Sequence, residues 1–163
     1  MEMNHKDIVV VGAGISGIGA AYNLKKTCPQ KTFTILEGRE NIGGTWDLFK
    51  YPGIRSDSDM HTMGFKFKPW TDPKTIADGP SIIEYLKEAV DENNLKDKIQ
   101  FRKKVISASW NSSEALWTLE IEDKTKDSLE NMTCNILYLC GGYYNYDEGY
   151  TPEFKGKNNF DGQ

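Results

Sequence analysis

Residues 8–17, with the sequence IVVVGAGISG, decide how this chain of 163 residues folds. Four β-branched residues in a row predict a strand that is buried on both faces, as in a parallel sheet. Three glycines follow in the spacing G-x-G-x-x-G, and residues 15–26 then predict a helix. Residues 33–37 predict a second strand. Together these segments predict one compact βαβ unit.

Each glycine of this turn has a separate task in a dinucleotide site. Gly12 makes the tight turn, Gly14 lets a diphosphate approach the backbone with no Cβ in the way, and Gly17 lets the helix pack on the strand. The phosphates would lie on the first helical turn, where free N–H groups and the helix dipole favour anions. Ile15 and Ser16 belong to that turn, so they join the glycines as candidate binding residues.

An acidic residue ends the second predicted strand. Glu37 lies 20 residues beyond Gly17, the spacing at which a carboxylate accepts hydrogen bonds from the two hydroxyls of a ribose. The same carboxylate would repel a 2′-phosphate. The ligand of this first site is therefore expected to be FAD or NAD rather than NADP.

The rest of the chain adds a long loop, a helix and a β-meander. Residues 41–78 are rich in glycine, proline and scattered aromatics, which predicts a loop, and a loop of that length is usually functional. Asp78-Gly79-Pro80 predicts a helix start with proline at the first helical position, and residues 81–92 carry one apolar stripe. Further strands are expected at 99–101, 105–110, 117–121, 132–134 and 136–139, of which the second to the fourth form the meander. The fold class is thus α/β, a Rossmann-like domain with a parallel sheet and a β-meander.

Composition excludes several classes of function. The net charge of −4 leaves no basic footprint for a nucleic acid, and no apolar run approaches the length that spans a bilayer. Three widely spaced cysteines form neither a disulfide framework nor a CxxC pair, which favours a reducing, cytoplasmic setting. The two histidines, His5 and His61, cannot build a metal cluster or a hydrolase triad.

Two further motifs carry a resemblance to a known family. Ile42-Gly43-Gly44-Thr45-Trp46, followed by the YPG-x-R-x-D pattern of residues 51–57, resembles the flavin-containing and Baeyer–Villiger monooxygenases, the class B flavoprotein monooxygenases. Residues 137–142, a strand that runs into Cys140-Gly141-Gly142, resemble the second FAD motif of that family. The resemblance covers nearly the whole chain. It implies a flavoprotein with two dinucleotide-binding domains, in which FAD occupies the first Rossmann unit.

The resemblance also implies which residues hold FAD and which take part in the chemistry. By this resemblance Asp57 lies near the flavin and an active-site arginine, and residues 55–57 line the NADP side, so Arg55 and Asp57 are the candidate catalytic residues. A cationic environment there would stabilise negative charge that develops during oxygen transfer. Val105 would offer backbone groups to the adenine. The candidate FAD-binding set is Gly12, Gly14, Ile15, Ser16, Gly17, Glu37, Gly38, Arg39, Gly44, Thr45, Trp46, Asp57, Met63, Val105, Cys140, Gly141 and Gly142.

The intact enzyme that the resemblance implies uses FAD and NADPH and transfers one oxygen atom from molecular oxygen to a small-molecule substrate, a ketone, sulfide or amine. Residues 1–163 are expected to form only its FAD-binding domain, without the NADPH domain and the C-terminal return. Phe160-x-Gly162 looks like the opening of a family fingerprint that ends in histidine, so we expect a truncated gene product or a deliberately shortened chain. Apolar surface left by a missing domain would favour self-association. Two alternatives stay open: a stand-alone, non-catalytic FAD-binding remnant and an NAD-linked oxidoreductase.

Overall fold

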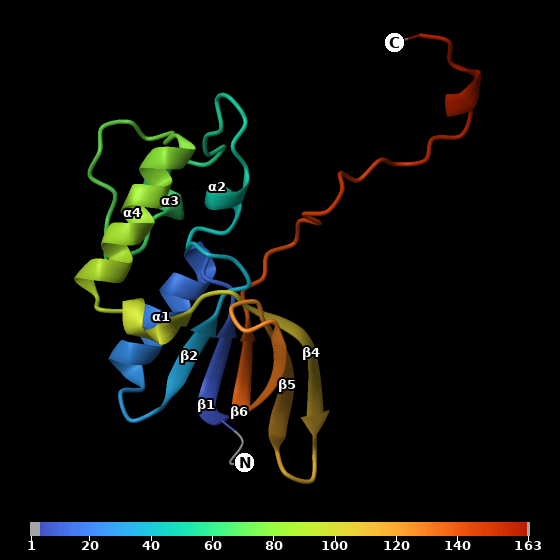
Figure 1. Ribbon diagram of the computed structural model, residues 1–163. Coiled ribbons are helices and arrows are strands. Elements are labelled where there is room, and N and C mark those ends of the chain that lie inside the picture. The colour runs from blue at the N-terminus through green and yellow to red at the C-terminus, as the bar shows by residue number, and fades with distance from the viewer. Residues whose placement is uncertain (1–3, 163) are drawn as a thin grey trace.

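The computed structural model describes residues 4–162, which contain six strands and four α-helices (Figure 1). In chain order these elements are β1 (Asn4–Val11), α1 (Ile15–Thr27), β2 (Phe33–Leu36), α2 (Thr45–Leu48), α3 (Met60–Met63), α4 (Gly79–Glu92), β3 (Ile99–Gln100), β4 (Lys103–Asn111), β5 (Leu116–Asp123) and β6 (Ser128–Leu139). Two short 3-10 turns lie at Lys96–Lys98 and Lys157–Asn159.

The strands form one mixed sheet in the order β3-β2-β1-β6-β5-β4. The first four strands of this order are parallel, and β5 and β4 continue the sheet in antiparallel pairing. This arrangement confirms the predicted α/β fold with a parallel sheet and a meander. The crossover from β1 through α1 to β2 is the predicted βαβ unit, since β1 and β2 pair in parallel.

β6 differs from the sequence prediction, which divided it into separate strands at 132–134 and 136–139. The structure has one strand of 12 residues, whose first part pairs with β5 and whose second part pairs with β1. No glycine or proline interrupts residues 128–139, and the exposed Asn135 stays within the strand. The predicted division is wrong because β1 pairs with β6 on both sides of Asn135 in one register, while β5 pairs with residues 128–134.

Two apolar cores lie on opposite faces of the parallel strands. Figure 1 shows α1 and α4 on one side of the parallel strands and the β4–β5 hairpin on the other. The helix-side core includes Val10, Ile35 and Leu86, all fully buried. The meander-side core includes Val9 and Leu119. Consecutive residues of β1 thus point into different cores, as expected of a strand that is buried on both faces.

One part of the helix side has no cover among residues 4–162. The register places Ile136 beside Ile8 and Tyr138 beside Val10, so both face the helix side. Their exposed fractions are 54% for Ile136 and 51% for Tyr138, while Val10 is fully buried under the helices. None of the helices in the described part of the chain has the length and apolar composition needed to cross a membrane.

The long loop of residues 41–78 is largely irregular, as predicted, with only the single turns α2 and α3. Its far end begins α4, where the Asp78 carboxylate accepts hydrogen bonds from the N–H and the hydroxyl of Ser81 at 2.9 and 2.7 Å. The helix starts at Gly79, so Pro80 occupies the second helical position and not the predicted first one. The difference arises because Asp78 acts as the N-cap and draws Gly79 into the first turn.

α1 packs against the end of β1 with no side chain between the two backbones. A Cβ on Gly17 would lie 1.9 Å from the carbonyl oxygen of Gly12, a separation that no side chain tolerates. Gly17 therefore allows the close approach of helix and strand that the sequence predicted. Gly19, one half-turn further along the same helix, meets only the ring edge of Phe65 at 3.1 Å.

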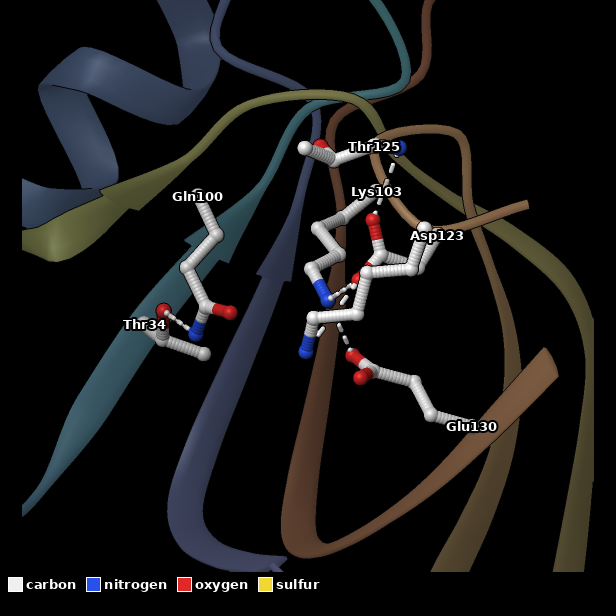
Figure 2. Close-up of polar contacts among 7 residues, drawn as sticks. Thr34, Gln100, Lys103, Asp123, Thr125 and Glu130 are labelled. Carbon is white, nitrogen blue, oxygen red and sulfur yellow. Dashed lines mark hydrogen bonds and ion pairs between the residues drawn. The ribbon is translucent and has the colours of Figure 1, made fainter. Parts of the chain in front are cut away.

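A cluster of three charged side chains, Lys103, Asp123 and Glu130, joins the strands of the meander. Figure 2 shows the Lys103 ammonium pointing to the carboxylates of Asp123 and Glu130, each at 2.7 Å. The side chain of Asp123 is 1% exposed, so its charge depends on this partner. The Lys103 ammonium beside Asp123 lowers the pKa of that carboxyl from 3.8 to about 2.

The pKa of Asp123 gives a stability prediction with a definite sign. Because its pKa is lower in the folded than in the unfolded chain, its contribution to stability is present above about pH 4 and is lost as the pH falls towards 2. Lys103→Met should lower the urea midpoint at pH 7, because it removes the nearer ammonium partner of the buried Asp123 carboxylate and leaves only Lys126 at 3.7 Å. The difference from wild type should shrink between pH 4 and pH 2. The exposed neighbour variant Lys104→Met should show no such pH dependence, and a constant difference for Lys103→Met would contradict the prediction.

Gly17→Ala should destabilise the fold by about 3 kcal/mol, because the added methyl group overlaps the backbone of Gly12. Gly19→Ala is the matched control in the same helix, since the Phe65 ring can shift and alanine favours the helix. Urea unfolding of the two variants measures the contrast. Equal stabilities would show that α1 does not need the close contact.

Candidate functional site

The candidate site lies where the carboxyl ends of β1, β2 and β6 meet, the edge at which α/β sheets bind ligands. The N–H of Gly12 donates to the Leu36 carbonyl at 2.8 Å, and the N–H of Cys140 donates to the Val11 carbonyl at 2.8 Å. Gly12 has a φ of +101°, and a Cβ there would lie 2.6 Å from the Cys140 carbonyl oxygen. The structure therefore brings the first glycine turn and the Cys140-Gly141-Gly142 segment together.

The first turn of α1 presents N–H groups without acceptors. Its N-cap, Gly14, provides no side chain, and no acidic residue lies in the first turn. The N–H groups of Ile15, Ser16 and Gly17 donate to no atom within residues 4–162, whereas that of Ile18 bonds the Gly14 carbonyl at 3.1 Å. Ser16 is exposed. Free N–H groups at a helix start have the chemistry of an anion site.

Glu37 is fixed beside this turn by both of its carboxylate oxygens. Oε2 accepts the N–H of Ala13 at 2.8 Å, and Oε1 accepts the N–H of Arg39 at 3.0 Å. The side chain is buried, and the backbone N–H of Glu37 bonds the Gln100 carbonyl at 2.9 Å. Each carboxylate oxygen keeps another lone pair, which is free to accept a ligand hydroxyl.

The second glycine turn packs directly on the first. The N–H of Gly43 donates to the Ala13 carbonyl at 2.9 Å, and a Cβ on Gly44 would lie 3.3 Å from the Cα of Gly14. Thr45 begins α2 immediately after this contact. Trp46 turns the other way and packs against the helix-side core, so it anchors the turn. The two glycine motifs, 30 residues apart in the sequence, form one backbone surface.

Arg39 connects the Glu37 turn with the second glycine turn. Its Nη1 donates to the Gly44 carbonyl at 2.9 Å, and its Nη2 pairs with the Asp47 carboxylate. A cavity of about 440 Å³ opens beside it, lined by Gly38, Arg39, Glu40, Asn41, Asp47, Arg102 and Lys124.

β4 approaches the same turn from the meander. The Cβ of Lys104 lies 3.4 Å from the position of a Cβ on Gly38. Val105 follows in the strand, and its pairing with β5 is interrupted by a bulge before Ser107. The candidate adenine contact at Val105 is thus on the strand that borders Gly38.

The candidate catalytic pair does not form an ion pair. Arg55 and Asp57 are both exposed and have no oppositely charged partner within 4 Å among residues 4–162, while Ser56 between them is buried. In an extended segment alternate residues face opposite sides, so the two charges share the outer side. The buried Ser56 hydroxyl has no hydrogen-bond partner in the described chain. Met63, in α3, packs against the helix-side core.

The segment that follows β6 lies against the loop after α2. Tyr144 and Tyr146 each make an edge contact with Phe49, with ring centroids 6.0 Å apart. Gly141 and Gly142 are exposed between these contacts and the sheet. Cys140 is half-buried against the helix-side core, and burial raises the pKa of its thiol. This environment suits a packing residue better than a reactive thiolate.

Sequence reasoning missed two contributors to the site. Ala13 connects Glu37 and Gly43 through its backbone, which no side-chain pattern reveals. Asp47 could have been noticed, because its charge is opposite to that of Arg39 eight residues earlier, with the glycine pair between them.

Comparisons with known proteins agree with this geometry. Residues 10–73 match the family model described as "NAD(P)-binding Rossmann-like domain". The FAD-containing monooxygenase EthA of Mycolicibacterium smegmatis is 55% identical over 159 residues, which are 98% of this chain and 32% of that protein. The probable FAD-binding monooxygenase AlmA of Acinetobacter baylyi is 54% identical over 159 residues, again 98% of this chain and 32% of the relative.

Solved structures give the same result. An oxidized steroid monooxygenase bound to NADP superimposes with a TM-score of 0.78 at 26% identity, over 95% of this chain and 29% of the other. A cyclohexanone-bound cyclohexanone monooxygenase gives a TM-score of 0.76 at 29% identity, over 88% of this chain and 28% of the other. The chain therefore belongs to the class B FAD-containing monooxygenase family, and it spans about a third of the length of these relatives.

Proposed function

We propose that this chain binds FAD, with the diphosphate on the first turn of α1 and the adenosine ribose on Glu37. The observation that carries the proposal is the open helix start: three N–H groups without acceptors lie beside a buried carboxylate that is fixed at both oxygens. The glycines of the two turns let backbone segments meet directly, since a Cβ on Gly12 would face the Cys140 carbonyl and a Cβ on Gly44 would face the Cα of Gly14. A dinucleotide with unphosphorylated ribose fits these features.

The proposal extends to the other residues of the second glycine turn and of the strand ends. Thr45 would offer the free N–H that starts α2, and Val105 would meet the adenine from β4. The full proposed set adds Ile15, Ser16, Gly17, Gly38, Trp46, Asp57, Met63, Cys140, Gly141 and Gly142, with Arg39 acting through its contacts on the second glycine turn. We treat residues 1–163 as one FAD-binding domain.

The whole protein is proposed to be an NADPH- and oxygen-dependent monooxygenase that inserts one oxygen atom into an organic substrate, a ketone, a sulfide or an amine. Family membership supports this, as do relatives named as FAD-containing monooxygenases. When bound, FAD supplies the electron transfer to oxygen, and the residues described here hold and orient it. Arg55, with its exposed guanidinium, would stabilise negative charge near the reacting atoms. The exposed Ile136 and Tyr138 support self-association of the isolated chain.

A charge placed on the first turn of α1 tests the diphosphate site. Ser16→Asp should weaken FAD binding at least about tenfold, because its carboxylate would lie where the diphosphate is proposed. An acidic residue at a helix start does not destabilise the helix, so the urea midpoint should stay the same or rise. Titration followed by flavin fluorescence measures the affinity.

The matched control is Ser16→Asn, which has nearly the same size without the charge and should bind FAD like the wild type. Equal binding by Ser16→Asp would contradict the proposed position of the diphosphate. Competition with NAD, measured in the same titration, separates an FAD site from a general dinucleotide site.

The 163 residues contain one G-x-G-x-x-G turn, which the proposal assigns to FAD. We therefore expect the chain alone to bind FAD without substrate-dependent consumption of NADPH. Steady-state absorbance of NADPH measures this, with free FAD as the background control. Turnover above that background would show that these residues also bind NADPH productively.

A further inference from the structure

Arg39 occupies an unusual place between the two glycine turns. Its backbone is fixed at both ends, because its N–H donates to Glu37 at 3.0 Å and its carbonyl accepts the N–H of Arg102 at 2.9 Å. Its side chain then reaches the Gly44 carbonyl at 2.9 Å and the Asp47 carboxylate. The guanidinium is therefore held on the second glycine turn by two contacts.

Asp47 poses an electrostatic problem for the proposed diphosphate site. It lies in the first turn of α2, which begins at the contact between Gly44 and Gly14. Its side chain is 16% exposed, so water screens its charge only in part. An unpaired carboxylate there would repel an incoming diphosphate.

Arg39 is the only cation within 4 Å of the Asp47 carboxylate in the part of the chain that the structure describes. Among the other cations that line the neighbouring cavity, Arg102 pairs with Glu40, and Lys124 makes no ion pair within residues 4–162. The guanidinium has a planar fork, so it can hold a carbonyl and a carboxylate at once. The two contacts that Arg39 makes on this turn therefore suit an arginine side chain.

We propose that Arg39 is a positioning residue, which holds the second glycine turn on the first and cancels the charge of Asp47 before the cofactor arrives. The inference rests on the proposed FAD function. It assigns Arg39 a role through Gly44 and Asp47, in place of the direct cofactor contact that the sequence suggested. The two backbone hydrogen bonds of Arg39 support this role, because they fix the position from which its side chain reaches Gly44 and Asp47.

A double-mutant cycle tests the proposal. Arg39→Gln should weaken FAD binding by roughly tenfold, because it leaves the Asp47 carboxylate unpaired beside the diphosphate. Asp47→Asn alone should stay within about threefold of wild type. The double variant should recover most of the lost affinity, and Arg39→Lys, which keeps the charge, should bind more tightly than Arg39→Gln. If Arg39 had only a structural role, replacing Asp47 by asparagine as well would not restore the affinity for FAD.

A second measurement uses the protein without FAD. The N–H groups of Gly43, Trp46 and Leu48 have backbone acceptors at 2.9 to 3.1 Å, so their hydrogen exchange reports on the second glycine turn. Exchange at these three positions should be faster in Arg39→Gln than in wild type. The exchange rates in β5, which is held between β4 and β6 in the meander, serve as the internal control.

The outcomes separate the two proposals. Wild-type protein that never binds FAD would overturn the proposed function, and the exchange rates would still decide whether Arg39 orders the turn. FAD binding in wild type combined with unchanged affinity in Arg39→Gln would overturn the role of Arg39 alone. A double variant that binds no better than Arg39→Gln would overturn the charge cancellation.

Discussion

Direct backbone contact is the constraint on which the rest of this structure depends. The Gly12 carbonyl occupies the space of a Cβ on Gly17, and the Cys140 carbonyl occupies the space of a Cβ on Gly12. These two contacts bring the start of α1 and the end of β6 to the same point on the edge of the sheet. The N–H groups of the helix start at Ile15, Ser16 and Gly17 meet no carbonyl within residues 4–162. The anion-binding chemistry of the turn is a consequence of this packing.

Charge is distributed over this edge in an order that suits a dinucleotide. Glu37 supplies a fixed acceptor on one side of the turn, and the α1 start supplies donors on the other. Two carboxylates thus lie near a proposed diphosphate, and each has a different partner: Glu37 accepts two backbone N–H groups, and Asp47 pairs with Arg39. Satisfied carboxylates near an anion site cost less electrostatic free energy than free ones.

Local patterns in the sequence were sufficient for the parts of the fold that depend on near neighbours. The strand of residues 8–11, the glycine turn and α1 follow from a run of β-branched residues and from glycine spacing within 20 residues. β6 was divided wrongly because its continuity depends on two partners, β5 and β1, that lie far away in the sequence. The absence of an ion pair between Arg55 and Asp57 among the described residues was likewise beyond the sequence, since nearness in the chain does not fix a side-chain contact. Arg39 was identified as a site residue, but its partners required the folded loop.

The continuous β6 strand connects the meander directly with the edge of the sheet that carries the candidate dinucleotide site. Its first half pairs with β5, which carries the buried Asp123 of the charged cluster, and its second half leads into Cys140 beside Gly12. A shift of β6 by one residue would move Cys140 away from Gly12 and would turn Met132 and Cys134 out of the meander-side core. The apolar side chains of the meander therefore fix the register that closes the glycine turn. The exposed Ile136 and Tyr138 lie on the opposite face of the same strand. A partner bound there would contact β6, the strand whose register closes the glycine turn.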